Sequence, residues 1–178
     1  MKSAQTTRRA VQAPTPEEFR HVIGHFLSGV TVVTTSLDGR QFGTTASAVT
    51  SVSLEPPTLL VCLNRTSETG AAIARSDRFA VNILAESQGA LASMFASKGA
   101  DKFAGAEPIE GPGGLPLLEA ALASVECRVL STAAAGTHTV FIGEVMSARS
   151  RDGEPLAYFR SRFGRFVRAE ENGARNSV

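Results

Sequence analysis

The first stretch of the chain with periodic hydrophobicity has the spacing of an amphipathic helix. Its apolar residues recur at intervals of three and four positions: Phe19, Val22, Ile23, Phe26 and Leu27. Upstream, Thr15, Pro16 and Glu18 have the pattern of a capping box, with a hydroxyl at the N-cap, proline in the first turn and glutamate at N3. The pattern predicts a helix that begins after Thr15 and ends near Ser28-Gly29.

After this helix the chain changes to short runs rich in β-branched residues, which are typical of strands. Seven such runs are predicted, at residues 30–36, 44–53, 57–63, 79–84, 122–132, 138–148 and 155–167. Asp38-Gly39 separates the first two runs, and glycine supplies the positive φ that a tight turn needs. We therefore expect the first two strands to be antiparallel neighbours.

Two short helices are predicted among the strands, at about residues 67–75 and 87–95. A parallel sheet would need a helix after nearly every strand, and the direct hairpin argues against that arrangement. The pattern therefore predicts a mainly β fold, an antiparallel closed barrel with a few short helices. The segment from Gly111 to Pro116 has the composition of a surface loop.

The length of 178 residues suits one domain. The polar, aperiodic ends predict flexible tails at residues 1–14 and 169–178, which leaves the domain at 15–168. A formal net charge of +1 offers no broad basic surface, which argues against nucleic acid as the main partner. No run reaches the roughly 18 to 20 apolar residues that cross a bilayer, so we expect no membrane partner and a cytoplasmic protein.

Metal and thiol chemistry find little support. Cys62 and Cys127 are far apart and form no C-x-x-C motif, which predicts two buried free thiols. His21 and His25 are four residues apart on the predicted helix, a spacing that can chelate a metal, but no third ligand is visible. We interpret the pair as part of the polar helix face and expect no metal site. The sequence also offers no Ser/His/Asp or Cys/His arrangement for nucleophilic catalysis.

The stretch from Asn64 to Thr69 follows a predicted strand and opens a predicted helix. Free backbone N–H groups, hydroxyls and the Arg65 guanidinium could converge there on a phosphate. The alternative is ordinary N-capping of the helix by Ser67. The chain has neither a G-x-G-x-x-G motif after a strand nor a G-x-x-x-x-G-K-[ST] motif. A nucleotide site would therefore have to be built differently, for example from a loop of this kind.

Small and hydroxyl side chains fill the predicted strand from Thr44 to Ser51, where bulkier residues are usual. Such a strand lets a flat ligand approach the backbone, whose N–H groups could bind a flavin ring. The alternative is close packing of the strand against a helix. His138 follows the loop AAAGT at the start of a strand, a position that can project into a cleft.

Taken together, these motifs resemble the short-chain flavin reductase family, the reductase components of two-component flavin-dependent monooxygenases. The matching pieces follow the family's order across roughly Phe19 to Phe166: GVTVVTT (29–35), GTTASAVTSVSLEPP (43–57), NRTSET (64–69), RFAVNIL (78–84), the helix at 88–95, KFAG (102–105), LPLLEAALASVEC (115–127), HTVFIGEV (138–145) and PLAYFRSRF (155–163). Relatives often carry an acidic residue before the histidine, where this chain has Thr137.

The resemblance implies a homodimer of FMN-binding split β-barrels of Greek-key type, with the flavin near the subunit interface. Carried over by position, the residues that would hold the isoalloxazine and ribityl chain are Thr45, Ala46, Ser47 and Ala48. The residues that would hold the phosphate end are Asn64, Ser67 and Thr69, with charge added by Arg65. His138 would lie near the nicotinamide and the flavin ring, and the segment Tyr158, Phe159 and Arg160 would help to close the pocket.

The activity that the resemblance implies is hydride transfer from NADH or NADPH to FMN or FAD, with reduced flavin passed to a partner monooxygenase. The absence of a nucleophile agrees with such chemistry. Two alternatives stay open: an FMN oxidase of the pyridoxamine-phosphate oxidase type, and a non-catalytic flavin-binding module for storage or sensing. The sequence decides neither FMN against FAD nor NADH against NADPH.

Overall fold

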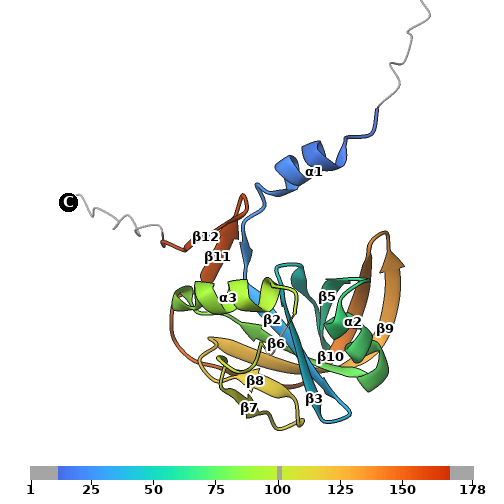
Figure 1. Ribbon diagram of the computed structural model, residues 1–178, viewed down its shortest axis with the longest axis vertical. Coiled ribbons are helices and arrows are strands. Elements are labelled where there is room, and N and C mark those ends of the chain that lie inside the picture. The colour runs from blue at the N-terminus through green and yellow to red at the C-terminus, as the bar shows by residue number, and fades with distance from the viewer. Residues whose placement is uncertain (1–11, 100–101, 169–178) are drawn as a thin grey trace, which may run out of the picture.

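The computed structural model describes residues 12–99 and 102–168, and its strands curl into a barrel with short helices around it (Figure 1). The predicted tails at 1–14 and 169–178 lie outside the described residues, except for residues 12–14. In chain order the elements are α1 (Pro16–Ile23), β1 (Ser28–Gly29), β2 (Thr31–Leu37), β3 (Arg40–Ala46), β4 (Val49–Leu54), β5 (Pro57–Asn64), α2 (Glu68–Ser76), β6 (Arg78–Ile83), the 3-10 turn η1 (Glu86–Gln88), α3 (Gly89–Ala96), β7 (Pro108–Glu110), β8 (Pro116–Leu118), β9 (Ala123–Ala135), β10 (His138–Ser150), β11 (Leu156–Phe159) and β12 (Arg162–Arg165).

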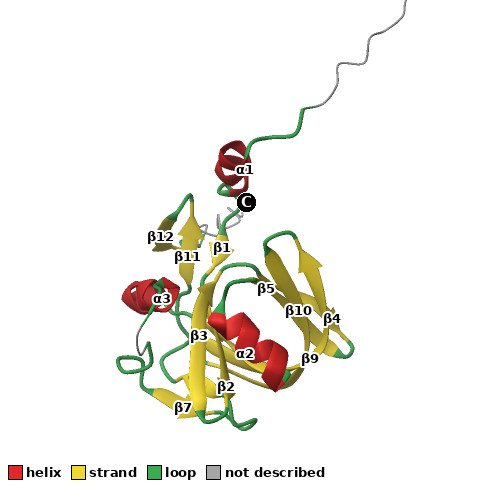
Figure 2. Cartoon of the chain, turned by 45° about the vertical axis from the view of Figure 1, so that its right-hand side comes forward, coloured by secondary structure: helices red, strands yellow, loops and turns green. Residues whose placement is uncertain are grey.

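Seven antiparallel strands form the main sheet, in the order β3-β2-β6-β9-β10-β5-β4. Its two edge strands, β3 and β4, are consecutive in the chain, so the short connection at Ser47-Ala48 joins opposite edges and the sheet must curl. The edges are not paired with each other, which leaves a split beside which α2 lies (Figure 2). The predicted mainly β antiparallel barrel is thus confirmed, with its closure incomplete.

The prediction of one strand over residues 44–53 is wrong. That segment forms the end of β3 and most of β4, with a bend at Ser47-Ala48 between them. Because the two strands belong to opposite edges of the sheet, the chain has to leave one hydrogen-bond ladder before it joins the other. The β2–β3 hairpin is confirmed, and both Asp38 and Gly39 have positive φ values, 50° and 75°, as a tight hairpin turn requires.

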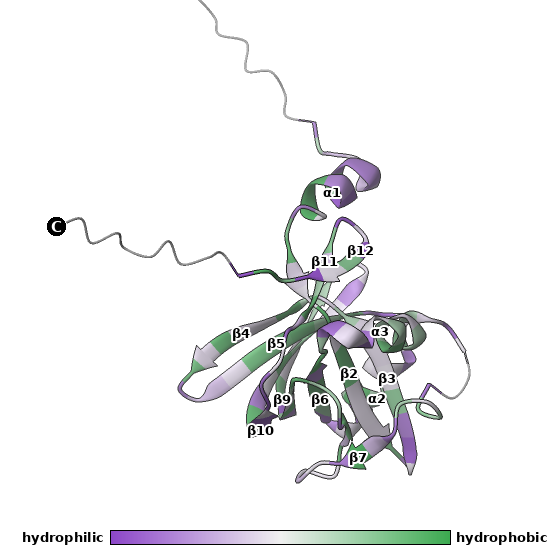
Figure 3. Cartoon of the chain, turned by 90° about the vertical axis from the view of Figure 1, so that its left-hand side faces the viewer, coloured by the Kyte–Doolittle hydropathy of each residue, from purple (hydrophilic) through white to green (hydrophobic). Residues whose placement is uncertain are grey.

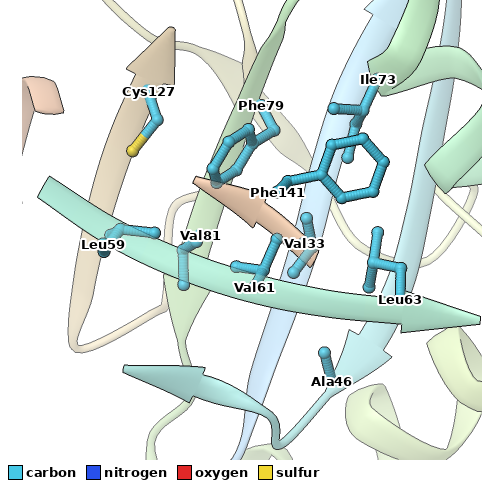
Figure 4. Close-up of a cluster of buried hydrophobic side chains, with 10 residues drawn as sticks. All are labelled: Val33, Ala46, Leu59, Val61, Leu63, Ile73, Phe79, Val81, Cys127 and Phe141. Carbon is cyan, nitrogen blue, oxygen red and sulfur yellow. The ribbon is translucent and has the colours of Figure 1, made fainter. Parts of the chain in front are cut away.

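Strand β2 separates two hydrophobic clusters because its successive side chains point to opposite faces. Val33 lies in the barrel core among residues of β5, β6, α2 and β10, which Figure 4 shows converging. Val32 lies in a second cluster, where Phe95 of α3 packs outside the barrel. A Cβ on Gly43 of β3 would stand 2.5 Å from the Phe95 ring, so only glycine lets α3 lie this close to β3.

Polar side chains buried beside the barrel are all hydrogen-bonded. Asn82, with no exposed surface, donates to the Val32 carbonyl at 3.1 Å and accepts from the Leu118 N–H at 3.0 Å and from the Ser124 hydroxyl at 2.9 Å. These bonds join β6 to β2, β8 and β9. These hydrogen bonds explain why a polar residue, Asn82, can occupy a buried position in β6, where the other buried residues are apolar.

The predicted surface loop from Gly111 to Pro116 is a turn with Pro112 and Gly114 exposed, and its backbone wraps around the carboxylate of Glu126, which is 2% exposed. Both carboxylate oxygens accept from the Gly113 N–H at 3.0 Å, and Oε1 also accepts from the Leu115 N–H at 3.3 Å. Ser147 donates its hydroxyl to Oε2 at 2.5 Å. A Cβ at Gly113 would stand 2.8 Å from Oε1, so glycine is needed for this approach. A buried carboxylate needs such donors, and the loop supplies them.

The elements at the two ends of the domain form a projection that we call the arm, residues 16–29 and 156–167 (Figure 1). In it, β1 pairs with β11 and β11 with β12, so the predicted strand at 155–167 is two strands joined by a turn at Arg160-Ser161. The capping box of α1 is confirmed, but the helix ends at Ile23, earlier than expected.

The predicted apolar stripe of α1 is exposed rather than packed on the barrel, and α1 has no buried residue. Figure 3 shows hydrophobic positions on both α1 and the β11–β12 hairpin. Nine large apolar side chains of the arm are each between 41% and 82% exposed: Phe19, Val22, Ile23, Phe26, Leu27, Phe159, Phe163, Phe166 and Val167. Within the described part of the chain, no helix is both long and apolar enough to span a membrane.

Replacing Glu126 by glutamine should lower the free energy of unfolding by about 1–3 kcal/mol. The loop N–H groups now donate to two carboxylate oxygens, and in the variant an amide NH2 group, which is itself a donor, would replace one of these oxygens. Urea titration followed by circular dichroism measures the change. The exposed Glu119 offers a matched control, and Glu119→Gln should leave stability nearly unchanged. Equal stability of the two variants would mean that Glu126 does not hold the loop.

Candidate functional site

Two segments that the sequence analysis singled out lie side by side at one end of the barrel. Asn64, the last residue of β5, stands opposite His138, the first residue of β10. The Arg65 N–H donates to the Thr137 carbonyl at 3.0 Å, which extends the pairing past the strand ends. Antiparallel pairing of β5 and β10 therefore brings the candidate phosphate loop to the candidate catalytic histidine.

The loop from Asn64 to Ser67 is organised by its own side chains. Asn64 Oδ1 accepts from both the N–H and the hydroxyl of Thr66 at 2.9 Å. Ser67 is the N-cap of α2 and accepts from the Gly70 N–H at 3.3 Å, so the ordinary capping interpretation holds for its hydroxyl. These hydrogen bonds thus hold the loop in one conformation at the start of α2.

Three donors in the first turn of α2 remain open. The N–H groups of Glu68 and Thr69 make no hydrogen bond with a described residue. The Thr69 hydroxyl also makes no hydrogen bond with a described residue; since no buried side-chain polar atom of the described residues lacks a partner, this hydroxyl reaches the surface although the residue as a whole is only 3% exposed. Beside a helix N-terminus, this set of donors suits an anion such as a phosphate.

His138 is exposed, and its ring is oriented by a neighbour. Its Nδ1 lies 2.9 Å from the Thr137 hydroxyl, which can donate to that nitrogen or accept from it. Thr137 therefore takes the orienting place that an acidic residue holds in the resembling family. The other ring nitrogen, Nε2, has no hydrogen bond with a described residue.

The strand of small residues divides into a packed part and an open part. Thr45 donates its hydroxyl to the Ala92 carbonyl of α3 at 2.6 Å, and Ala46 lies in the barrel core, so close packing against a helix explains both. Ser47 and Ala48 are exposed at the bend. The Ala48 carbonyl accepts from the Cys62 N–H at 2.9 Å, two residues before Asn64, which places the bend near the candidate phosphate loop.

The segment from Tyr158 to Arg160 is on the arm, and Figures 1 and 2 show β11 and β12 apart from β10, whose first residue is His138. Tyr158 pairs with Ser28, and the half-buried ring packs 5.7 Å from that of Phe163. Phe159 meets His25 edge to face. The Arg160 N–H donates to the Gly24 carbonyl at 3.0 Å. A single chain therefore does not bring this segment to the candidate histidine.

Surface grooves also lie on the arm. One of about 850 Å³ is lined by apolar and basic residues of the β11–β12 hairpin, among them Phe159, Arg160, Arg162 and Phe163. A smaller one of about 310 Å³ lies between α1 and the hairpin turn. Neither groove contains a residue of the phosphate loop or His138. Among residues 12–99 and 102–168, no group of three His, Cys, Asp or Glu side chains could hold a metal ion.

The two cysteines differ from the prediction of a buried pair. Cys127 is buried, and that burial, with the nearby charge of Glu126, raises the pKa of its thiol to about 12. Cys62 is only partly buried and points out of the barrel, since its neighbours Val61 and Leu63 point into the core. Neither thiol is bonded to the other.

One charged residue near this region was not singled out from the sequence. Lys102 donates from Nζ to the Phe95 carbonyl at 3.0 Å and to the Gly43 carbonyl at 3.3 Å. Partial burial lowers the pKa of its ammonium group, and the charge of Glu68 opposes that shift. The only feature of the sequence that could have drawn attention to Lys102 is its place in the segment KFAG, which matches the family.

Comparison with known proteins places these features in context. A family model described as a flavin reductase like domain matches residues 23–166. The reductase component of a 4-nitrophenol 4-monooxygenase/4-nitrocatechol 2-monooxygenase from Rhodococcus opacus is 50% identical over 150 residues, which cover 84% of this chain and 80% of that protein. The FMN reductase (NADH) RutF of Stutzerimonas stutzeri is 35% identical over 162 residues, 89% of this chain and 93% of that one.

Among solved structures, an NADH:FAD oxidoreductase of Streptomyces globisporus in complex with NAD and FAD fragments superposes with a TM-score of 0.82 and 33% identity. The match covers 88% of this chain and 98% of that one. The similarity thus extends over the barrel, the candidate site and most of the arm.

Proposed function

The chain belongs to the family of flavin reductase like domains, and on that premise we propose that it reduces FMN or FAD with NADH or NADPH. The observation that carries the proposal is the match over residues 23–166, which contain every candidate site residue. The relatives named as reductase components and as an NADH-dependent FMN reductase support the same reaction.

The open donors of the first turn of α2 fit the phosphate end of a flavin. The N–H groups of Glu68 and Thr69 and the Thr69 hydroxyl would donate to phosphate oxygens, and the helix dipole favours their negative charge. Arg65, exposed at the loop, would add a positive charge. Ser67 and Asn64 accept hydrogen bonds from the loop through their side-chain oxygens, and the Ser67 O–H and the Asn64 amide N–H groups would still be able to donate to the phosphate.

The bend at Ser47-Ala48 fits the flavin ring, since exposed small side chains leave the backbone open to a flat ligand. The Thr45 hydroxyl is used by α3, so Thr45 and Ala46 would contribute through the backbone alone. When bound, the nicotinamide supplies a hydride and the flavin accepts it, so the protein needs no nucleophile. What these residues do is hold the two rings at a near-attack distance of roughly 3–3.5 Å.

His138 would contact the nicotinamide or the flavin ring. Thr137 holds Nδ1, so Nε2 is the ring atom left to contact a ligand. An exposed imidazole beside the phosphate loop can donate a hydrogen bond to a carbonyl of either ring system without taking part in covalent chemistry. Its role would be to orient, and the reduced flavin would then pass to a partner monooxygenase, as the names of relatives indicate for those proteins.

Reduced nicotinamide nucleotides are made inside the cell, so the proposal places the protein in the cytoplasm, in keeping with two cysteines that form no disulfide. A pyridoxamine-phosphate oxidase activity or a storage role gains no separate support from the described residues. Both stay as outcomes of the assay below.

The proposed activity is tested by following NADH and NADPH oxidation at 340 nm in air, with FMN, FAD or riboflavin added in turn. We expect turnover that requires added flavin, and the rates also identify the preferred flavin and nucleotide. Tight flavin binding without turnover would favour a storage or sensor protein. A protein that shows no flavin binding and no turnover would contradict the proposed function.

Replacing His138 by alanine should lower the rate constant for flavin reduction roughly three- to tenfold, the effect of losing one hydrogen bond to a ligand. The dissociation constant of the flavin should change less than twofold. Single-turnover absorbance at 450 nm measures the first quantity, and fluorescence titration the second. His21→Ala, a histidine of the arm, serves as the control; an equal rate in both variants removes His138 from the mechanism.

We further propose that the protein is a homodimer in which the arm is the contact surface. An eight-residue helix is not stable in water by itself, yet α1 has no buried residue within one chain. A fully exposed side chain of this size offers about 150–250 Å² of accessible surface. Scaled by their exposed fractions, the nine apolar side chains of the arm together present roughly 1,000 Å² of accessible surface. A stable interface buries about 800 Å² per partner, so a second copy of this surface is sufficient.

Phe26→Asp should convert the dimer into a monomer, because a charge would be buried in the contact. Light scattering after size-exclusion chromatography should give twice the mass of one chain for the unaltered protein and half of that for the variant. Leu130→Asp is the matched control, since Leu130 is 50% exposed on β9, away from the arm. Dissociation by the control alone would place the interface on the barrel instead.

A further inference from the structure

We propose that the groove of the β11–β12 hairpin holds helix α1 of a second copy of this chain, and that the two copies insert their helices into each other's grooves reciprocally. The inference rests on the proposed homodimer and states which surfaces of the two arms meet. The spacing of the apolar residues on α1, the lining of the groove and the charges of both carry it.

Helix α1 and the turn after it have the pattern of a helix that docks into a groove. The apolar residues recur at positions i, i+3, i+4 and i+7, the spacing of the anchor residues on such helices: Phe19, Val22, Ile23 and Phe26. These four side chains are between 51% and 75% exposed. Phe26 follows the last residue of α1, but its N–H donates to the Ile23 carbonyl at 3.0 Å, so the apolar stripe continues over this turn. A stripe of this width normally faces another surface rather than water.

The groove of about 850 Å³ matches this helix in lining and in length. Leu27 and the rings of Phe159 and Phe163 supply apolar surface. The four-residue strands β11 and β12 extend over roughly 13 Å, and the eight residues of α1 over roughly 12 Å. Of residues 16–29, which are all described, Leu27 alone lines the groove, so the chain's own α1 lies outside it.

The charges of the helix and of the groove are complementary. The first turn of α1 is acidic and includes Glu17, whereas the groove is lined by Arg160, Arg162 and Arg165. Arg165 is paired with Glu86 at 2.6 Å. Arg160 and Arg162 form no ion pair with a described residue, and neither does Glu17. A second copy's α1 in the groove would bring its acidic first turn to these arginines, which favours association of the two copies.

The attachment of α1 makes the exchange reciprocal. The Gly24 carbonyl accepts from the Arg160 N–H at 3.0 Å, so the end of α1 is fixed at the hairpin turn of its own chain, and both project from the barrel (Figure 1). From there the helix reaches the groove of a copy whose hairpin faces this one. A two-fold axis between the two hairpins makes both contacts identical, as in most homodimers.

The same apolar stripe would also be covered if the two α1 helices packed against each other. In that arrangement the groove and its arginines would stay outside the contact, and a charge at position 162 would not affect dimerisation. Insertion into the groove requires that charges at positions 17 and 162 of different copies act on each other. The two arrangements therefore differ in a measurable coupling.

The coupling is tested with two charge reversals, Glu17→Arg and Arg162→Glu, and sedimentation equilibrium of each variant. Alone, either variant places like charges in both contacts of its dimer. Each should raise the dissociation constant about 100-fold, roughly tenfold for each contact. An equal mixture of the two variants should regain most of the lost affinity, because both contacts of the mixed dimer again join an arginine to a glutamate.

Glu119→Arg, a reversal at an exposed carboxylate of the barrel, is the matched control and should leave the dissociation constant unchanged. Recovery in the mixture keeps the test decisive even if Glu17→Arg weakens α1, because mixing does not stabilise a helix within one chain. Single variants that dimerise like the unaltered chain would overturn the proposal, and so would a loss that mixing does not repair. Either result leaves the homodimer standing if Phe26→Asp still dissociates it, whereas an unaltered chain that is monomeric would overturn both.

Discussion

The close approach of α3 to strand β3 is the constraint on which the rest of the structure depends. Gly43 has no side chain, so the Phe95 ring lies directly on the strand and closes the second hydrophobic cluster. The same approach brings the Ala92 carbonyl to the Thr45 hydroxyl and the Phe95 carbonyl to Lys102. A larger residue at position 43 would move the helix and, with it, the neighbourhood of the candidate site.

The candidate site itself is an outcome of how the barrel remains split. Since β3 and β4 are opposite edges of one sheet, the chain between them has to cross the opening, and small residues at 47 and 48 leave that crossing exposed. The helix α2 lies beside the same split with open donors in its first turn. The loop after β5, the first turn of α2 and His138 therefore lie together where the pairing of β5 with β10 ends.

Several expectations from the sequence hold because they depend on neighbouring residues. The capping box at Thr15 and the turn at Asp38-Gly39 form as predicted, since each is decided by side chains and φ values within four positions. Other features were not predicted, because distant residues decide them. The segment from Gly111 to Pro116 is the surface turn that its composition predicts, but nothing local shows that its N–H groups bind the buried carboxylate of Glu126. Likewise, no local signal marks the bend that divides residues 44–53 into two edge strands.

The sequence by itself determined the class of fold, most of the strands, the local turns and the family resemblance, because alternation, capping and turn chemistry act over a few residues. Only the tertiary structure decided that Asn64 faces His138, that Thr45 is occupied by α3, and that the arm projects with its apolar stripe uncovered. Those facts depend on which strands pair and which helices pack together. Such long-range contacts are selected by the burial of the whole core rather than by any short segment.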